Sequence, residues 1–236
     1  MLNTTIYNQW SQISSYIQTL WWIPSEQEDW YKDKILTAFV HKSYASDFVP
    51  ALDHNERYEF LWDGILWWAI AFLLFESHPE WSEAQMTLYK IALVREEMLA
   101  QVAREIRLAD HIFISHGEEG QWGRDKDVIL ADTLEALIGV WYEIQGFESV
   151  KSFISKYILI HLQELQETDC KSYKSLLQEW TQKQGLPIPE YSTIEHLVEW
   201  FEAQVCITDT VFGRWIGKNK KKAHEQAAKD AYHKIV

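Results

Sequence analysis

Residues 128–142 read VILADTLEALIGVWY and place two acids, Asp132 and Glu135, three positions apart in an otherwise apolar stretch. Apolar residues recur there at three- and four-residue spacing, which predicts a buried helix. An ionised carboxylate in such surroundings is costly unless it is paired or binds a metal. The segment therefore predicts a helical core whose acids are either paired with other side chains or bind a metal ion.

The same helical spacing extends outward along the chain, and we expect residues 5–160 to form an all-α domain. The expected helices include residues 35–45, 58–75, 86–106 and 128–142. The longest apolar run, residues 65–75, is about half of the roughly 20 residues that a membrane helix needs, so we expect a core helix and no membrane partner.

The location of the protein is predicted to be cytoplasmic. The first residues have no basic segment followed by an apolar core, so they do not resemble a secretory signal. Cys170 and Cys206 lack metal or redox spacing and are expected to be reduced thiols.

The pattern changes after residue 162. We expect a domain over 1–162, a polar linker over 163–170 and a second domain over 171–236. The second domain reads as a helix, three short strands and a helix, an α-β-β-β-α order typical of a small α+β module. The expected elements are residues 172–184, 190–194, 200–208, 211–218 and 220–235.

The charge of the chain is divided unevenly between these parts. The net charge of −13 disfavours a phosphate-binding protein at first sight. However, residues 1–168 hold 12 basic against 26 acidic side chains, whereas residues 169–236 hold 10 against 9. Within the latter, residues 214–234 hold seven basic against two acidic side chains, which predicts a local basic patch.

A second acidic cluster precedes the apolar run of the first domain. Glu56, Glu59 and Asp63 follow i, i+3, i+7 spacing and so project from one helix face. Two helices that each present acids a turn apart can converge on Mg²⁺, which prefers oxygen ligands. A solvated helix face explains such a triplet about equally well on these residues alone.

Three ordered blocks then carry a family resemblance. Residues 54–63 (HNERYEFLWD), 93–105 (LVREEMLAQVARE) and 123–139 (GRDKDVILADTLEALIG) resemble the endonuclease domain of bacterial ribonuclease III, and residues 41–45 (HKSYA) fit its upstream segment. The resemblance implies a homodimer that cleaves double-stranded RNA with Mg²⁺, for which Mn²⁺ can substitute. It implies a role in processing ribosomal and messenger RNA and no activity on DNA.

The same resemblance implies the roles of individual acids. Glu59, Asp63, Asp132 and Glu135 correspond to the metal ligands, with Asp63 and Glu135 as catalytic groups. Glu56 and Glu83 correspond to auxiliary acids, although residues 87–91 depart from the arginine-bearing pattern that usually follows Glu83.

Residues 176–191 and 217–232 resemble the double-stranded-RNA-binding domain. The resemblance implies that Gln178 and Gln182 contact the minor groove and that a lysine run contacts phosphates. That run is Lys218, Lys220, Lys221 and Lys222. A solvated charge run is the alternative for these lysines taken alone. The segment 196–200 is shorter than the loop of that family and lacks its Gly-Pro-x-His element.

Tryptophan is unusually common, with 13 residues against 9 glycines. Trp62, Trp122, Trp215 and Trp67 stand where the family has glycine, which serves close backbone approach or positive φ. One hypothesis is a divergent homologue that tolerates tryptophan. The other is that the organism reads UGA as glycine, so that some of these tryptophans are glycine in the cell.

We therefore predict an all-α endonuclease domain followed by an α+β RNA-binding domain, acting together as a Mg²⁺-dependent endoribonuclease. An alternative is a non-catalytic binder of double-stranded RNA whose cleavage centre is impaired by Trp62. A third possibility is a helical scaffold for acidic or protein partners, which would have no affinity for RNA.

Overall fold

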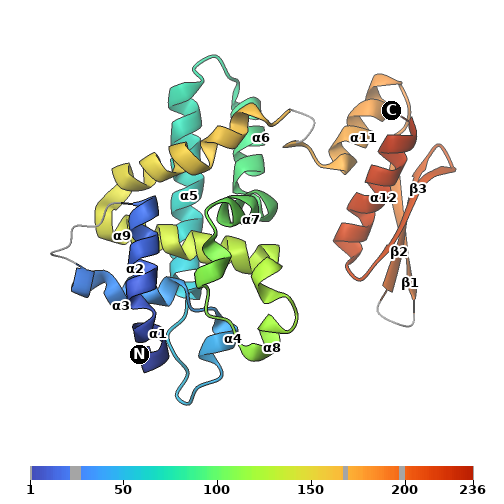
Figure 1. Ribbon diagram of the computed structural model, residues 1–236. Helices are drawn as coiled ribbons and strands as arrows, with labels where there is room; N and C mark the ends of the chain where they lie inside the picture. Colours follow the sequence, from blue (N-terminus) through green and yellow to red (C-terminus); the bar gives the residue numbers. More distant parts are fainter. Residues whose placement is uncertain (1, 22–27, 167–169, 197–199, 236) are drawn as a thin grey trace. The chain divides into compact units, whose positions relative to one another are not determined.

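The computed structural model describes residues 2–21, 28–166, 170–196 and 200–235. The chain divides into two compact units, Met1–Leu165 and Gln166–Val236 (Figure 1). Each unit has its own hydrophobic core and is described separately below.

The N-terminal unit is helical, as the sequence predicts. The chain first forms α1 (Thr4–Asn8), α2 (Trp10–Leu20), α3 (Glu28–Ala38), α4 (Lys42–Ala45), α5 (Glu56–Ser77), α6 (Glu83–Val94) and α7 (Glu96–Glu105). It then forms η2 (Leu108–His111), α8 (His116–Glu119), η3 (Gly123–Asp125), α9 (Asp127–Tyr157) and η4 (Leu159–Gln163), the η elements being 3₁₀ helices. The two longest helices, α5 and α9, pack against each other.

The contact between α5 and α9 is close because a glycine lies in it. A Cβ atom on Gly139 would lie 2.7 Å from the backbone oxygen of Tyr58, which is shorter than any real contact. Trp62 and Trp141 are among the largest fully buried side chains of the same core. The first turn of α5 is therefore held next to the fourth turn of α9, which brings together the two helices predicted to carry the acids.

Two predicted helices are broken in the structure. Over residues 35–45, α3 ends at Ala38 and α4 begins at Lys42, because Val40 forms a parallel bridge with Phe113. Over residues 86–106, Arg95 takes an extended conformation with ψ of 148° and separates α6 from α7. Helix α9 extends to Tyr157, but it is kinked at Gly146, whose backbone is non-helical with φ of 74° and ψ of −172°, so its first straight part ends close to the predicted end at residue 142.

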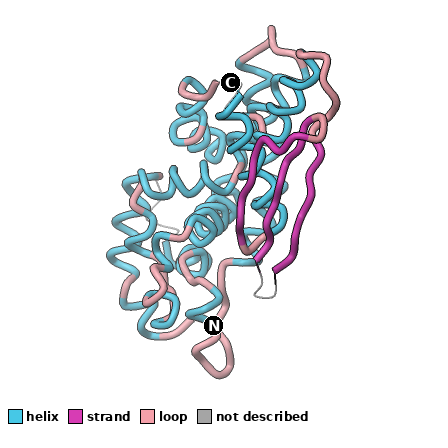
Figure 2. The backbone as a smooth tube through the Cα atoms, turned by 90° about the vertical axis from the view of Figure 1, so that its right-hand side faces the viewer, coloured by secondary structure: helices cyan, strands magenta, loops and turns pink. Residues whose placement is uncertain are grey.

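The C-terminal unit contains a three-stranded antiparallel sheet in the order β1-β2-β3 (Figure 2). Its elements are α11 (Tyr173–Lys183), β1 (Glu190–His196), β2 (Trp200–Ile207), β3 (Thr210–Gly217) and α12 (Lys220–Ile235). Alternate residues of β2, including Ala203 and Val205, are fully buried and form the inward face of the strand. A Cβ atom on Gly213 would lie 2.1 Å from the backbone oxygen of Ala227, so β3 packs directly on α12.

Helix α5 has the length and apolar composition of a helix that could cross a membrane, and about a third of that stretch is buried in the unit. A core helix of a soluble protein passes the same test, so this property is weak evidence by itself. The exposed part of the apolar surface of α5 is considered below.

Candidate active site and RNA-binding surface

An acidic cleft lies where α5 and α9 meet. Glu56 and Glu59 project from the first turn of α5, and Asp132 and Glu135 lie one turn apart on α9. One carboxylate oxygen from each of Glu59, Asp132 and Glu135 lies within 4.8 Å of the other two. The structure therefore brings three of the four predicted metal ligands together. The fourth, Asp63, belongs to α5, but its side chain lies outside the described part of the chain.

The cleft is open to solvent and has room for small ligands. Its volume is about 310 Å³, and it is lined by Glu56, Glu59, Phe60 and Glu135. The three converging acids are half-buried. Oxygen donors at this spacing suit a hard divalent cation such as Mg²⁺ or Mn²⁺.

The electrostatics of the cleft centre on Asp132. Its pKa is raised to about 7, mainly by burial and secondarily by the negative charge of Glu59, while Lys42 acts in the opposite direction. Carboxylates held this close cannot all stay ionised without a compensating charge. The donor set is therefore strained in the absence of a cation, which is the state expected of a metal-binding cluster.

A lysine that the sequence prediction did not single out also lies at this cleft. Lys42 Nζ donates a hydrogen bond to Glu56 Oε1 at 2.9 Å. This pairing raises the pKa of Lys42 and lowers the pKa of Glu56, and Asp132 and Glu59 also contribute to the rise at Lys42. The segment HKSYA was noted as part of the family resemblance, but its spacing from Glu56 carries no signal that the two side chains meet.

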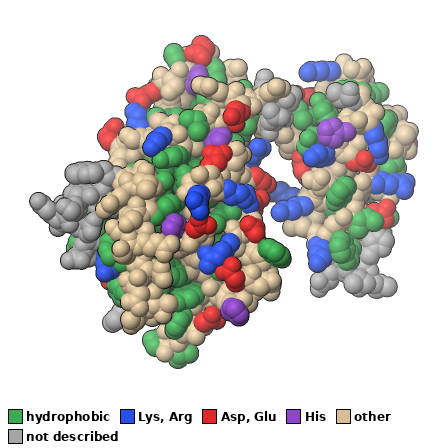
Figure 3. All heavy atoms as spheres, viewed as in Figure 1, with side chains coloured by type: hydrophobic (Ala, Val, Ile, Leu, Met, Phe, Trp, Pro, Cys, Tyr) green, Lys and Arg blue, Asp and Glu red, His purple; other side chains and the backbone are tan. Residues whose placement is uncertain are grey.

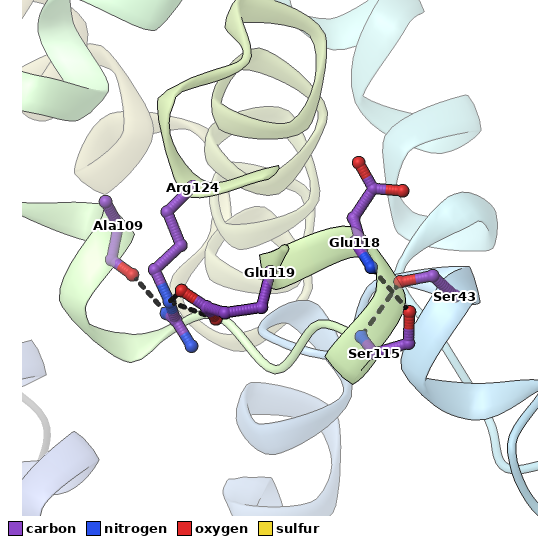
Figure 4. A network of polar contacts seen from close by, with 6 residues as sticks. All are labelled: Ser43, Ala109, Ser115, Glu118, Glu119 and Arg124. Atoms are coloured by element: carbon purple, nitrogen blue, oxygen red, sulfur yellow. Dashed lines mark hydrogen bonds and ion pairs between the residues drawn. The ribbon is translucent and has the colours of Figure 1, made fainter. Parts of the chain in front are cut away.

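The short helix that carries Lys42 is held in place by a polar network. Ser43 Oγ accepts a hydrogen bond from the backbone N–H of Ser115 at 3.1 Å, and Ser115 Oγ caps α8 by accepting from the N–H of Glu118 (Figure 4). The buried His41 caps α4 through Nδ1, which accepts from the N–H of Ser43. These contacts fix α4 against the loop that leads into α9.

The same loop is fastened at its other end by Arg124. Its guanidinium group donates to the backbone oxygen of Ala109 and pairs with Glu119 at 2.8 Å (Figure 4). Lys126, just before α9, pairs with Glu118. The start of α9 is thereby anchored a few residues before Asp132.

The predicted auxiliary acids have different surroundings. Glu56 lines the cleft, as described above. Glu83 begins α6 and is exposed, and its carboxylate accepts a hydrogen bond from Thr87 Oγ1 at 3.0 Å. Glu83 is not among the three acids that converge in the described part of the cleft.

The predicted RNA-binding residues lie on the surface of the C-terminal unit. Figure 3 shows several lysine and arginine side chains on the visible face of this unit. The four predicted lysines, Lys218, Lys220, Lys221 and Lys222, are exposed at the end of β3 and in the first turn of α12. Asn219 caps that helix by accepting from the N–H of Lys222 at 3.1 Å. A positively charged helix start of this kind suits phosphate groups.

Two further predicted contacts lie on α11. Gln178 and Gln182 are both exposed and one turn apart, so both amides face solvent from the same helix. Of the short β1–β2 loop, residues 197–199 and the side chain of His196 lie outside the described residues. Next to it, Lys218 Nζ lies 5.5 Å from the ring centre of Trp200, a side chain that is 40% exposed.

The four tryptophans at expected glycine positions have unlike environments. Trp62 is fully buried in the core and is not among the residues that line the cleft. Trp122 has a positive φ of 58° and is exposed. Trp215 lies in β3 and Trp67 in α5, and both are partly exposed with ordinary backbone conformations. The indole of Trp62 is in the core and does not line the cleft formed by the described acids, which argues against a cleavage centre blocked by Trp62.

Comparison with known proteins agrees with both units. Residues 32–162 match the Ribonuclease-III-like family model, and residues 173–235 match the Double-stranded RNA binding motif. The chain is 34% identical over 205 residues to Ribonuclease 3 of Natranaerobius thermophilus, covering 85% of this chain and 89% of that protein. It is 35% identical over 205 residues to Ribonuclease 3 of Streptomyces coelicolor, covering 85% of this chain and 74% of that protein.

Solved structures show the same relation for the nuclease fold. The nuclease domain of ribonuclease III from Campylobacter jejuni aligns with a TM-score of 0.56 and 30% identity, covering 64% of this chain and 99% of that one. A helical nuclease unit followed by an RNA-binding module defines a class of endoribonucleases that act on double-stranded RNA. The chain belongs to the ribonuclease III family.

Proposed function

We propose that the chain is a homodimeric endoribonuclease that hydrolyses both strands of double-stranded RNA with divalent metal ions, Mg²⁺ by preference and Mn²⁺ as a substitute. The observation that carries the proposal is the convergence of Glu59, Asp132 and Glu135 in an open cleft of a ribonuclease III fold. Asp63 is proposed as the further ligand because it follows Glu59 by one turn of α5.

The residues of the cleft would divide the work as follows. Glu59 and Asp63 of α5, with Asp132 and Glu135 of α9, would hold the ions. The positive charge of the ions would offset the burial and the repulsion from Glu59 that raise the pKa of Asp132. Bound metal ions can activate a water nucleophile and stabilise charge on the leaving oxygen. The chain supplies the rigid spacing, since Gly139 fixes the approach of α5 to α9. The C-terminal unit would hold the duplex by its shape and phosphates.

A cleavage assay tests the proposal. Long double-stranded RNA is incubated with the full chain and Mg²⁺, and Glu135→Gln is compared with Glu97→Gln, which changes an exposed acid on α7. We expect Glu135→Gln to lower the cleavage rate at least about 100-fold while RNA binding stays intact, because a metal ion supplies several kcal/mol of transition-state stabilisation. If the wild-type chain binds the duplex and never cuts it, the proposal is wrong.

The homodimer rests on the apolar surface of α5. Large side chains are exposed along this helix, namely Phe60 (86%), Leu61 (43%), Trp67 (41%), Trp68 (54%) and Phe75 (68%). The opposite face of α5 is buried in the core, so residues 65–75 of the helix are apolar all round, which is typical of a helix segment that is fully covered. We propose that a second copy of the chain covers this stripe. Such an interface would lie beside the cleft, because Phe60 also lines the cleft.

Sedimentation equilibrium tests the dimer. Phe60→Glu places a charge in the stripe and should convert the dimer to a monomer and reduce cleavage. Val49→Glu is the matched control because Val49 is also fully exposed and lies outside α5. A Phe60→Glu variant that remains as dimeric as the wild type would contradict the interface.

We further propose that the substrates are structured regions of ribosomal and messenger RNA precursors in the cytoplasm. Cys170 and Cys206 are thiols and not disulfide-bonded, which is compatible with a reducing compartment. Comparison of RNA 5′ ends in cells with and without the active protein tests the role in processing, and unchanged precursor ends would contradict it.

A further inference from the structure

Lys42 places a positive charge at the edge of the acidic cleft, and metal binding by the acids does not explain why a cationic side chain lies there. Its ammonium group reaches the edge of the acidic cleft and, within the described part of the chain, donates a hydrogen bond to Glu56 Oε1 at 2.9 Å. A lysine ammonium has three N–H donors, so further donors are left for a ligand. The side chain is 63% exposed, and an approaching molecule can therefore contact it.

The backbone that carries Lys42 is held in place by hydrogen bonds to two neighbouring segments. The backbone N–H of Asn55 donates to the oxygen of Val40 at 2.9 Å, which ties the segment to the start of α5. On the other side, the N–H of His41 donates to the oxygen of Phe113 at 3.0 Å. With the hydrogen bond from Ser115 to Ser43, these contacts hold α4 between α5 and the loop before α9.

The charge of Lys42 also bears on the acids that converge in the cleft. Glu59 and Asp132 both interact electrostatically with Lys42, in addition to its contact with Glu56. A fixed positive charge at this place repels an incoming divalent cation and attracts an RNA phosphate. The two effects come from one group and can be measured separately.

We infer that Lys42 is a substrate-positioning residue whose ammonium group binds a phosphate of the duplex beside the metal-binding acids and weakens metal binding while RNA is absent. This inference rests on the proposed function and assigns a role to a residue outside the metal-binding set. Glu56 holds the ammonium group at the edge of the cleft, where the RNA backbone must pass to reach the acids. Metal and substrate binding are then coupled, because the phosphate neutralises the charge that opposes the metal.

The first experiment measures Mn²⁺ binding to the full chain without RNA, by electron paramagnetic resonance. Lys42→Gln removes the charge, and we expect Mn²⁺ to bind about threefold more tightly, as a screened Coulomb interaction between a single and a double charge predicts. Lys151→Gln is the matched control, since Lys151 pairs with Glu76 at the other end of α5. It should leave Mn²⁺ binding unchanged.

The second experiment measures kcat/KM for duplex RNA at several salt concentrations with saturating Mg²⁺. We expect Lys42→Gln to lower kcat/KM about tenfold, the size of a hydrogen bond to a charged group. The slope of log kcat/KM against log salt should become shallower by about one, because one phosphate contact fewer releases one counterion fewer. Lys42→Arg keeps the charge and should therefore retain most of the wild-type kcat/KM and most of the wild-type salt slope. A purely structural role of Lys42 would not predict this result.

The outcomes separate this inference from the proposed function. If the wild-type chain does not cut RNA at all, the proposed function fails. If it cuts RNA and Lys42→Gln matches Lys151→Gln in Mn²⁺ affinity and salt slope, the role of Lys42 is refuted. Tighter Mn²⁺ binding with an unchanged salt slope likewise refutes the phosphate contact. Circular dichroism confirms folding of each variant, and Lys42→Met replaces Lys42→Gln if the latter unfolds.

Discussion

The pKa of Asp132 makes a quantitative prediction for the stability of the metal-free protein. The pKa is about 7 in the folded chain against 3.8 for an unperturbed aspartate. Between these two values the folded chain keeps a proton that the unfolded chain releases, so the unfolded state binds fewer protons. The free energy of unfolding must therefore fall as pH rises through this range, and the full penalty is present above pH 7.

The magnitude follows from the width of the pH window. Between pH 5 and pH 7 the folded chain holds a proton that the unfolded chain has released. Over these two pH units the free energy of unfolding falls by about 3 kcal/mol for a fully buried group. Asp132 is only half-buried and faces the open cleft, so solvent screening reduces this to about 1.5 kcal/mol. Asp132→Asn keeps the shape of the side chain and removes its ionisation, so it should abolish this part of the pH dependence.

The assay is urea unfolding in the presence of a chelator at pH 5 and pH 8. The wild-type chain should lose about 1.5 kcal/mol more than Asp132→Asn between the two pH values. Asp47→Asn changes an exposed aspartate of the same unit and controls for a general loss of negative charge. Histidines titrate in the same pH range and change the stability of every variant. The test is therefore the difference in pH dependence between the wild type and Asp132→Asn, and not the wild-type profile by itself.

Metal provides a second check on the same group. Adding Mn²⁺ at pH 8 should restore stability to the wild-type chain, because a cation that binds only the folded state shifts the unfolding equilibrium. The same addition should stabilise Asp132→Asn less. Parallel pH profiles for the wild type and Asp132→Asn would refute the reasoning, as they would show that the cleft does not hold back ionisation at this position.

Three further predictions concern other parts of the chain. Replacing both Lys220 and Lys221 by alanine should weaken binding to duplex RNA and make its salt dependence shallower by about 1 to 2 in the log–log slope; an unchanged slope in a filter-binding series would contradict the assignment. Gly213→Ala should destabilise the C-terminal unit by about 1–3 kcal/mol through overpacking against α12; hydrogen exchange measures the effect, with Gly217→Ala as the tolerated change on the same strand. Trp122→Gly should stabilise the chain by about 0.5–1 kcal/mol, because a non-glycine residue at positive φ is strained; a lower melting temperature would contradict it.

The C-terminal unit could be predicted closely because its signals are local. The predicted helix 220–235 coincides with α12, and each of the three predicted strands differs from the observed one by two residues or fewer at either end. Gly185 has a positive φ of 69° just after α11, as expected for a glycine that stops a helix. Each of these elements begins and ends at residues whose own chemistry marks the boundary.

The breaks in the N-terminal unit could not be predicted in the same way. Helical spacing continues on both sides of Val40, and the break there depends on pairing with Phe113, which is distant in sequence. The contact between Lys42 and Glu56 could not be predicted for a related reason. Its partner Glu56 lies 14 positions away on another helix, so only the tertiary structure brings the two side chains together. The acids could be singled out because each pair lies on a single helix, and the family resemblance then implied their role as metal ligands.

The environments of the four tryptophans differ in how well they suit an indole, and this bears on whether each position is tryptophan or glycine in the cell. Glycine at position 122 would relieve a left-handed backbone, whereas the indole there gains little burial in return. Trp62 is fully buried, yet its indole N–H has no hydrogen-bond partner among the described residues, an arrangement that is usually costly. Trp67 and Trp215 show neither kind of strain. If UGA is read as glycine in the organism, positions 62 and 122 are therefore the first to examine, and peptide mass spectrometry of natively expressed protein distinguishes the two residues directly.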